Sequence, residues 1–310
     1  MESRPQFNNA EPGSTSGLRS RLLTVSPPFD LARTAAPIWW GRGRWPNVDW
    51  RDGTFFWVGW EDGNLAWRCV RQANEQDLEI QGASNASLDA QWARSVLGIR
   101  AVMPRFQDSV LAGLASTHAG LRPWSAGSLF VGVVTSIVGQ SISVAAAAIT
   151  EQRLFALFNE PMHVDGRLYW PPPRPDQLGS ASAGFVRGSG VTTKRAEALV
   201  AVGALFATAA VTDGVNEESG EPSVSELLLA IPGVGPWTVR SALLWGVGSS
   251  DSHPTGDVAL LRAAKRHYAS VMGLKDLDRL SEEWKPNRGW AARLLWLDLL
   301  GFDSKGRLPG

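Results

Sequence analysis

The chain has 310 residues, 44% of them hydrophobic and 19% charged, and its 30 basic side chains are balanced by 30 acidic ones. This length allows two domains with a substantial core, and the composition is that of a soluble globular protein. A single cysteine, Cys69, excludes an internal disulfide and a four-cysteine iron–sulfur cluster. The zero net charge argues against a broad basic surface, but it leaves open phosphate binding through backbone N–H groups.

The first part of the chain predicts a small α+β domain. Residues 1–17 are polar and without periodicity, which is typical of a disordered tail. A short helix is expected within 29–43, two strands joined near Asp62-Gly63 within 54–72, and a helix over 88–98. Tryptophan is frequent here, and we expect most of these rings in the core rather than on an aromatic surface. The N-terminal domain is therefore placed at 18–120.

From residue 121 to residue 310 the pattern is helical. The segment 128–158 is apolar nearly all round, as in buried helices, and is interrupted at Gly139-Gln140. Another helix is expected over 190–210, and a last one over 281–302 with Trp290, Leu294 and Leu297 on one stripe. The fold class predicted for the whole chain is α+β, mostly α, with a small antiparallel sheet before a helical domain.

The stretch 223–268 contains a helical hairpin. Ser223 and Glu226 form a capping-box pattern, and the run from Pro232 to Pro236 separates that helix from a second one that Gly246 can end. Asp257 then stands at the start of a third helix. The inner face expected for this third helix consists of Val258, Leu261, Ala264 and Tyr268.

This hairpin, together with Trp237 and Asp257, resembles the helix-hairpin-helix (HhH-GPD) DNA glycosylase superfamily, and within it the 3-methyladenine DNA glycosylase II (AlkA-like) branch. The resemblance covers 121–302 well and 18–120 only loosely. It implies an enzyme of base excision repair that flips alkylated purines, of the 3-methyladenine and 7-methylguanine type, out of duplex DNA and removes them hydrolytically. The implied partner is double-stranded DNA with a damaged base, bound by a monomer without cofactor or metal.

The resemblance also implies roles for individual residues. Asp257 is the candidate catalytic carboxylate, which would stabilise an oxocarbenium-like sugar and polarise water. The residues expected against the base are Trp296, Trp237 and Trp290. The residues expected against the DNA backbone and stack are Gln140, Ser141, Gly233, Val234, Gly235, Trp237 and Thr238. The family commonly has a bulky side chain, inserted into the DNA base stack, where this chain has Ser141. The inserted side chain is therefore expected to be Gln140 or Ile142, or the insertion is weak.

Trp237 stands where strand-cutting relatives carry a lysine, and an indole cannot form a Schiff base. We therefore expect a monofunctional glycosylase that leaves an abasic site. No side chain that would read a base edge is identifiable from the sequence, which predicts broad excision of N3- and N7-alkylpurines.

Two alternatives remain at this point. One is a glycosylase for oxidised or deaminated bases, and the other is a non-catalytic helix-hairpin-helix DNA-binding protein. The start of the chain has no signal-peptide pattern and no segment long enough to span a bilayer, so we expect a cytoplasmic protein, nucleoid-associated if bacterial.

Overall fold

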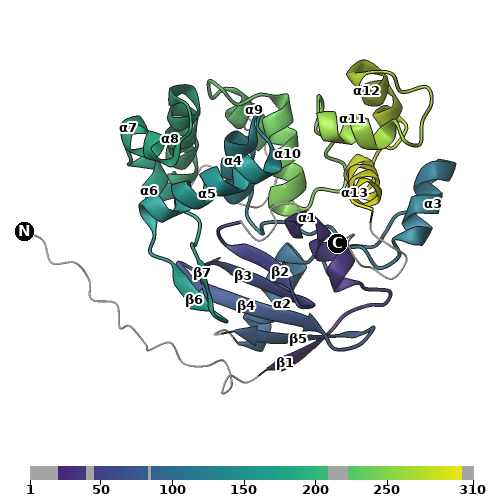
Figure 1. Cartoon of the computed structure of the whole chain (residues 1–310), viewed down its shortest axis with the longest axis horizontal. Coiled ribbons are helices and arrows are strands. Elements are labelled where there is room, and N and C mark those ends of the chain that lie inside the picture. Colours follow the sequence, from purple (N-terminus) through teal and green to yellow (C-terminus); the bar gives the residue numbers. More distant parts are fainter. Residues whose placement is uncertain (1–19, 40–44, 83–84, 209–222, 302–310) are drawn as a thin grey trace, which may run out of the picture.

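The computed structural model describes residues 20–39, 45–82, 85–208 and 223–301. The tail predicted at 1–17 lies outside these residues. Within them, an antiparallel sheet lies beneath two lobes of helices, and helix α10 runs between the lobes (Figure 1). The predicted class, mostly α with a small antiparallel sheet, is confirmed.

The sheet has five strands in the order β1-β5-β4-β3-β2. Its central hairpin was predicted, and it turns at Asp62 and Gly63, both with positive φ, so that Glu61 pairs with Asn64. The two outer strands and β5 were not predicted. The strand bounds are β1 Arg21–Thr24, β2 Val48–Arg51, β3 Thr54–Glu61, β4 Asn64–Gln72 and β5 Asp77–Gly82.

The two faces of the sheet are covered by different elements. Phe55 and Trp57 point to the face packed by helices α1 (Leu31–Trp39) and α2 (Ala86–Val96), where Trp57 lies 5.7 Å from Trp92 between ring centroids. Phe56 points to the opposite face, which the hairpin β6 (Met162–Val164) and β7 (Arg167–Tyr169) covers. This alternation is the period of two expected of a strand buried on both sides. The buried Trp57 and Trp92 agree with a tryptophan-rich core.

The helices form two hydrophobic clusters. Helices α4, α5, α8 and α10 contribute to one cluster, and α3, α11, α12 and α13 to the other. Helix α10 belongs to both, since Val239 and Ala242 face the first cluster and Leu244 the second. The helix bounds are α3 Ser109–Thr117, α4 Leu129–Gly139, α5 Val144–Phe158, α6 Pro175–Gly179, α7 Ala183–Val186, α8 Thr193–Ala207, α9 Val224–Leu229, α10 Pro236–Val247, α11 Val258–Ala264, α12 Leu274–Glu282 and α13 Arg288–Leu299, with a 3-10 turn at Arg187–Ser189.

Three local predictions were wrong. Gly246 does not end α10; it lies inside the helix, where a Cβ on Gly132 of α4 would come within 2.5 Å of the Gly246 Cα, and Gly248 forms the left-handed cap instead. Val258 is not on the inner face of α11, because its side chain is 64% exposed. The helix expected over 281–302 begins only at Arg288, after α12 has ended and the chain has turned.

The placement of α3 also bears on the domain organisation. This helix falls in the segment 18–120, yet Leu111 and Leu114 pack in the cluster around α13.

Of the described helices, none is long and apolar enough to cross a membrane.

Candidate active site

The carboxylate of Asp257 is held by a hydrogen bond on each oxygen. As N-cap of α11 it accepts from the Leu260 backbone N–H through Oδ1 at 2.7 Å, and Oδ2 accepts from the indole Nε1–H of Trp237 at 3.2 Å. The Asp257 side chain is only half-buried, and the neighbouring Thr255, Gly256 and Val258 are exposed. A fixed negative charge therefore lies at the edge of an open surface. The N-cap role of Asp257 was predicted from the sequence, whereas its hydrogen bond with Trp237 was not.

The hairpin between α9 and α10 places a helix N-terminus on the surface. Both bonds of the predicted capping box form at α9, Ser223 N to Glu226 Oε2 at 2.7 Å and Glu226 N to Ser223 Oγ at 3.3 Å. Gly233 has a positive φ of 91°, whereas Gly235 is extended (φ −109°, ψ 176°) and is the N-cap of α10. Because the first N–H groups of a helix lack intrahelical acceptors and lie at its positive end, this hairpin offers donors to an anion.

Gln140 joins the turn between α4 and α5 to this hairpin. Its side-chain amide donates to Gly233 O and to Thr238 Oγ1, each at 2.9 Å, and its own carbonyl accepts from the Arg195 guanidinium. The side-chain amide nitrogen of Gln140 is thus hydrogen-bonded within the protein, and its role in the DNA stack stays a prediction. The exposed apolar side chain at this turn is Ile142, 37% exposed, and the preceding Ser141 is exposed with a φ of 54°.

The structure brings most of the predicted DNA-contacting residues to one place. Gln140 bonds Gly233 and Thr238, and Trp237 bonds Asp257, so the turn, the hairpin and the carboxylate form one connected surface. Val234 and Thr238 have buried side chains, so these two residues can contribute only backbone groups to a ligand. The DNA contacts themselves stay predictions.

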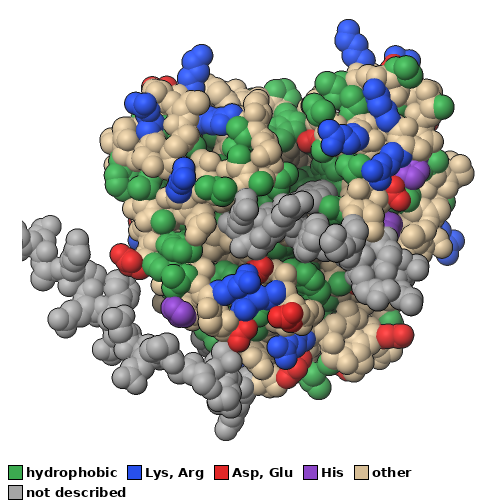
Figure 2. All heavy atoms as spheres, in the orientation of Figure 1, with side chains coloured by type: hydrophobic (Ala, Val, Ile, Leu, Met, Phe, Trp, Pro, Cys, Tyr) green, Lys and Arg blue, Asp and Glu red, His purple; other side chains and the backbone are tan. Residues whose placement is uncertain are grey.

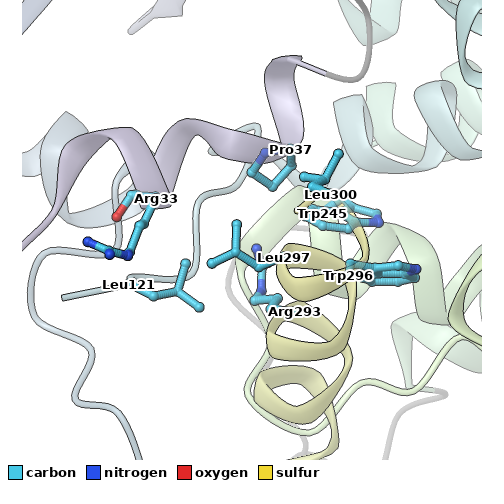
Figure 3. Close-up of a pocket in the computed structure, with 9 residues that line it drawn as sticks. Arg33, Pro37, Leu121, Trp245, Arg293, Trp296, Leu297 and Leu300 are labelled. Atoms are coloured by element: carbon cyan, nitrogen blue, oxygen red, sulfur yellow. The ribbon is translucent and has the colours of Figure 1, made fainter. Parts of the chain in front are cut away.

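The predicted base-contacting tryptophans on α13 are buried. Trp296 is 4% exposed, lies 5.3 Å from Trp245 between ring centroids, and lines a pocket together with Pro37 of α1 (Figure 3). Trp290 is equally buried in the core and does not line this pocket. Trp237 is half-buried and directs its N–H to Asp257. Their contacts with a base stay predictions.

Two residues of this pocket were missed from the sequence as functional candidates. The Trp245 ring packs against Trp296 with an interplanar angle of 31°, and the Arg293 guanidinium carbon lies 4.6 Å from the Trp245 ring centroid. Helical spacing could have identified Arg293 from the sequence, because it precedes Trp296 by three positions and so lies on the same face of α13.

Two of the four histidines, His118 and His253, are buried. His253 precedes Asp257 by four residues, and its Nε2 lies 3.1 Å from Asp278 Oδ1. Burial lowers the pKa of His253, so its ring is neutral near pH 7. Among the described residues no group of three or more His, Cys, Asp or Glu is arranged to hold a metal ion.

Basic side chains flank the site although the whole chain is neutral. Figure 2 shows Lys and Arg side chains on both helical lobes, with apolar side chains between them. Around the hairpin and α11 the exposed basic residues are Lys194, Arg240, Arg262, Lys265 and Arg266. A local positive rim on a neutral protein suits a polyanion bound at one face.

Comparison with known proteins agrees with this geometry. No protein-family model matches the chain. It is 30% identical over 195 residues to DNA-3-methyladenine glycosylase 2 of Escherichia coli, covering 62% of this chain and 66% of that protein. It is 22% identical over 191 residues to a DNA-3-methyladenine glycosylase of Bacillus subtilis, covering 61% and 63% respectively. The matched segments thus span slightly less than two thirds of these two relatives.

Solved structures share the fold. A 3-methyladenine DNA glycosylase from Archaeoglobus fulgidus superposes with a TM-score of 0.74 at 16% identity, covering 89% of this chain and 97% of its own. An 8-oxoguanine glycosylase/lyase from Clostridium acetobutylicum, in complex with double-stranded DNA, gives a TM-score of 0.68 at 15% identity, covering 87% and 91%. At these identities the superpositions show the fold alone.

The chain has the fold of the helix-hairpin-helix DNA glycosylases, and its sequence is similar to 3-methyladenine DNA glycosylases. These likenesses support a place in the AlkA-like branch of that superfamily. The similarity supports a glycosylase of base excision repair.

Proposed function

We propose that this protein is a monofunctional DNA glycosylase that flips alkylated purines out of duplex DNA and hydrolyses their glycosidic bond. The observation that carries the proposal is the Asp257 carboxylate, held on both oxygens beside the open hairpin. The hairpin would bind a phosphate through backbone donors, and Ile142 is the side chain best placed to fill the gap left by the flipped nucleotide.

The chemistry follows from the charges. An alkylated purine already carries positive charge, so it leaves readily, and the transition state is an oxocarbenium-like sugar. A preoriented carboxylate stabilises that cation without having to reorganise, and it can accept a proton from the attacking water. The exposed surface next to Asp257 leaves room for the sugar and that water.

A panel of duplexes tests the proposal, each with one 7-methylguanine, 3-methyladenine, hypoxanthine or 8-oxoguanine. We expect the alkylpurines to be released and the strands to break only after alkali treatment. Removal of 8-oxoguanine without removal of alkylpurines would favour the oxidised-base alternative. That alternative is retained because an 8-oxoguanine glycosylase/lyase has the same fold. Tight duplex binding without release of any base would identify a non-catalytic DNA-binding protein.

The absence of strand cleavage gives a separate prediction. The position in the hairpin helix where an amine would attack the sugar is Trp237, whose N–H is engaged by Asp257. Borohydride added during turnover should therefore trap no covalent protein–DNA adduct. A trapped adduct would show that another amine reaches the sugar, and peptide mapping would identify it.

Trp237 itself is expected to orient Asp257. Trp237→Phe keeps an aromatic ring but removes the N–H donor, so the Asp257 Oδ2 loses its partner. We expect single-turnover base release to slow roughly 10- to 150-fold, since a hydrogen bond to a charged group contributes about 1.5–3 kcal/mol. Duplex affinity, measured by fluorescence anisotropy, should be unchanged. An unaltered release rate would leave Trp237 as a packing residue only.

A further inference from the structure

The segment that carries Asp257 is fastened to two neighbouring helices. It connects α10 to α11 and forms neither a helix nor a strand. The Arg288 guanidinium donates to both carboxylate oxygens of Asp251, at 3.0 and 2.8 Å. Ser252 Oγ donates to the Arg240 carbonyl at 2.7 Å. These bonds hold the first half of the segment against α13 and α10.

His253 anchors the segment at the point closest to Asp257. Its side chain is 4% exposed, and its Nε2 lies 3.1 Å from Oδ1 of Asp278 on α12. A single turn follows, in which the Asp257 N–H donates to the Pro254 carbonyl at 3.1 Å. Because so little chain lies between the imidazole and the carboxylate, a shift of His253 is passed on to Asp257.

The surroundings of His253 suit a neutral ring. With the Asp278 carboxylate as acceptor, the single ring proton of the neutral form lies on Nε2. Nδ1 is buried and, within the described part of the chain, has no hydrogen-bond partner. A second proton would therefore create a buried N–H donor without an acceptor, which is costly.

Charged groups reach this ring from several helices. Burial, the largest effect, lowers the pKa of His253 from its ordinary 6.5, and the Arg288 cation adds to it, whereas Asp278 and Asp257 raise the pKa. Arg240, the charged residue of α10, is exposed. Since the cost of burial exceeds the attraction to Asp278, a ring that becomes protonated below pH 6.5 favours a conformation that opens Nδ1 to water.

We infer that neutral His253, bonded to Asp278, is a positioning residue that holds the Asp257 carboxylate in place for catalysis. Loss of that bond, or protonation of the ring, would let the turn before α11 shift and move the carboxylate away from the sugar. Misplacing a catalytic group by about 1 Å can slow a reaction about 100-fold. The inference rests on the proposed function for its effect on rate, but the position of Asp257 can be measured without catalysis.

Two substitutions separate the hydrogen bond from the ring's charge. His253→Gln offers an amide N–H to Asp278 and cannot be protonated near neutral pH, whereas His253→Leu fills the site without a donor. At about pH 8, single-turnover release of 7-methylguanine should be nearly normal in His253→Gln and about 10- to 100-fold slower in His253→Leu. Duplex affinity should be unchanged in both. Acidification to about pH 5 should slow the unmodified protein but not His253→Gln.

The chain offers a second histidine–carboxylate pair as a control. His267 follows α11, and its Nε2 lies 2.9 Å from Asp298 Oδ2. It lies outside the segment that leads to Asp257, so His267→Leu should keep the normal release rate and the normal dependence on pH.

The Trp237 indole N–H reports the position of Asp257 without catalysis, because the two side chains are hydrogen-bonded. Its magnetic resonance signal, in protein with isotope-labelled tryptophan, is identified by its absence from Trp237→Phe. We expect this signal to shift when the unmodified protein is acidified below pH 6.5. It should already be shifted at about pH 8 in His253→Leu, and it should stay in place in His253→Gln over the whole range.

An unmoved Trp237 signal or a normal release rate in folded His253→Leu would overturn the inference. So would an acid response that His253→Gln shares with the unmodified protein, and this comparison decides alone should His253→Leu fail to fold. The two proposals can fail separately. If no duplex loses a base, the glycosylase is refuted, whereas an acid shift of the Trp237 signal that disappears in His253→Gln would leave the positioning role of His253 standing.

Discussion

Replacing Asp257 with asparagine is expected to slow base release by about two to four orders of magnitude, since loss of one transition-state electrostatic contact costs about 10²–10³. Asparagine can still accept from the Leu260 N–H and so cap α11, but it carries no charge for the sugar cation. The other side-chain atom is then the amide nitrogen, a donor that opposes the Trp237 N–H. Single-turnover release of 7-methylguanine measures the rate.

The chain offers a matched control for this variant. Asp108 is also a helix N-cap, at α3, where Oδ1 accepts from the Leu111 N–H at 2.9 Å and from the Tyr268 hydroxyl at 2.9 Å. Asp108→Asn should keep the normal release rate, with at most a modest loss of thermal stability. If Asp257→Asn released bases as fast as Asp108→Asn, the catalytic assignment would be wrong.

Gly235→Asp is expected to reduce duplex affinity by at least tenfold without unfolding the protein. Its backbone is extended, and a Cβ there would meet no atom within 4 Å, so the substitution causes no clash. Aspartate is moreover a better N-cap than glycine. The same carboxylate would occupy the hairpin donors and repel a phosphate, so DNA binding and fold stability should respond in opposite directions.

The control for this effect is Gly273→Asp. Gly273 is the N-cap of α12, is likewise extended (φ −150°, ψ 179°), and has open space at its Cβ position. It is distant in sequence from the hairpin, so its variant should bind duplex DNA normally at the same ionic strength. Equal affinities of the Gly235→Asp and Gly273→Asp variants for duplex DNA would show that the hairpin has a structural role only.

The features predicted correctly are those that neighbouring residues decide. The capping box at Ser223 and Glu226, the N-cap role of Asp257 and the turn at Asp62-Gly63 all follow from backbone donors and φ preferences within four residues. The helix break after Gly139 is local in the same sense. Such signals were sufficient to place the hairpin and the carboxylate in the right elements and to support the superfamily assignment.

The sequence by itself therefore determined which elements carry the site, whereas only the tertiary structure decided what each side chain touches. Val258 is exposed and Gly246 is packed on α4 because neighbouring helices, not helical periodicity, set their surroundings. The Trp237 bond to Asp257 and the Gln140 bonds to the hairpin join segments far apart in the chain. The burial of Arg293 likewise depends on how α1, α10 and α13 pack, because a charge is costly only where the fold removes water from it.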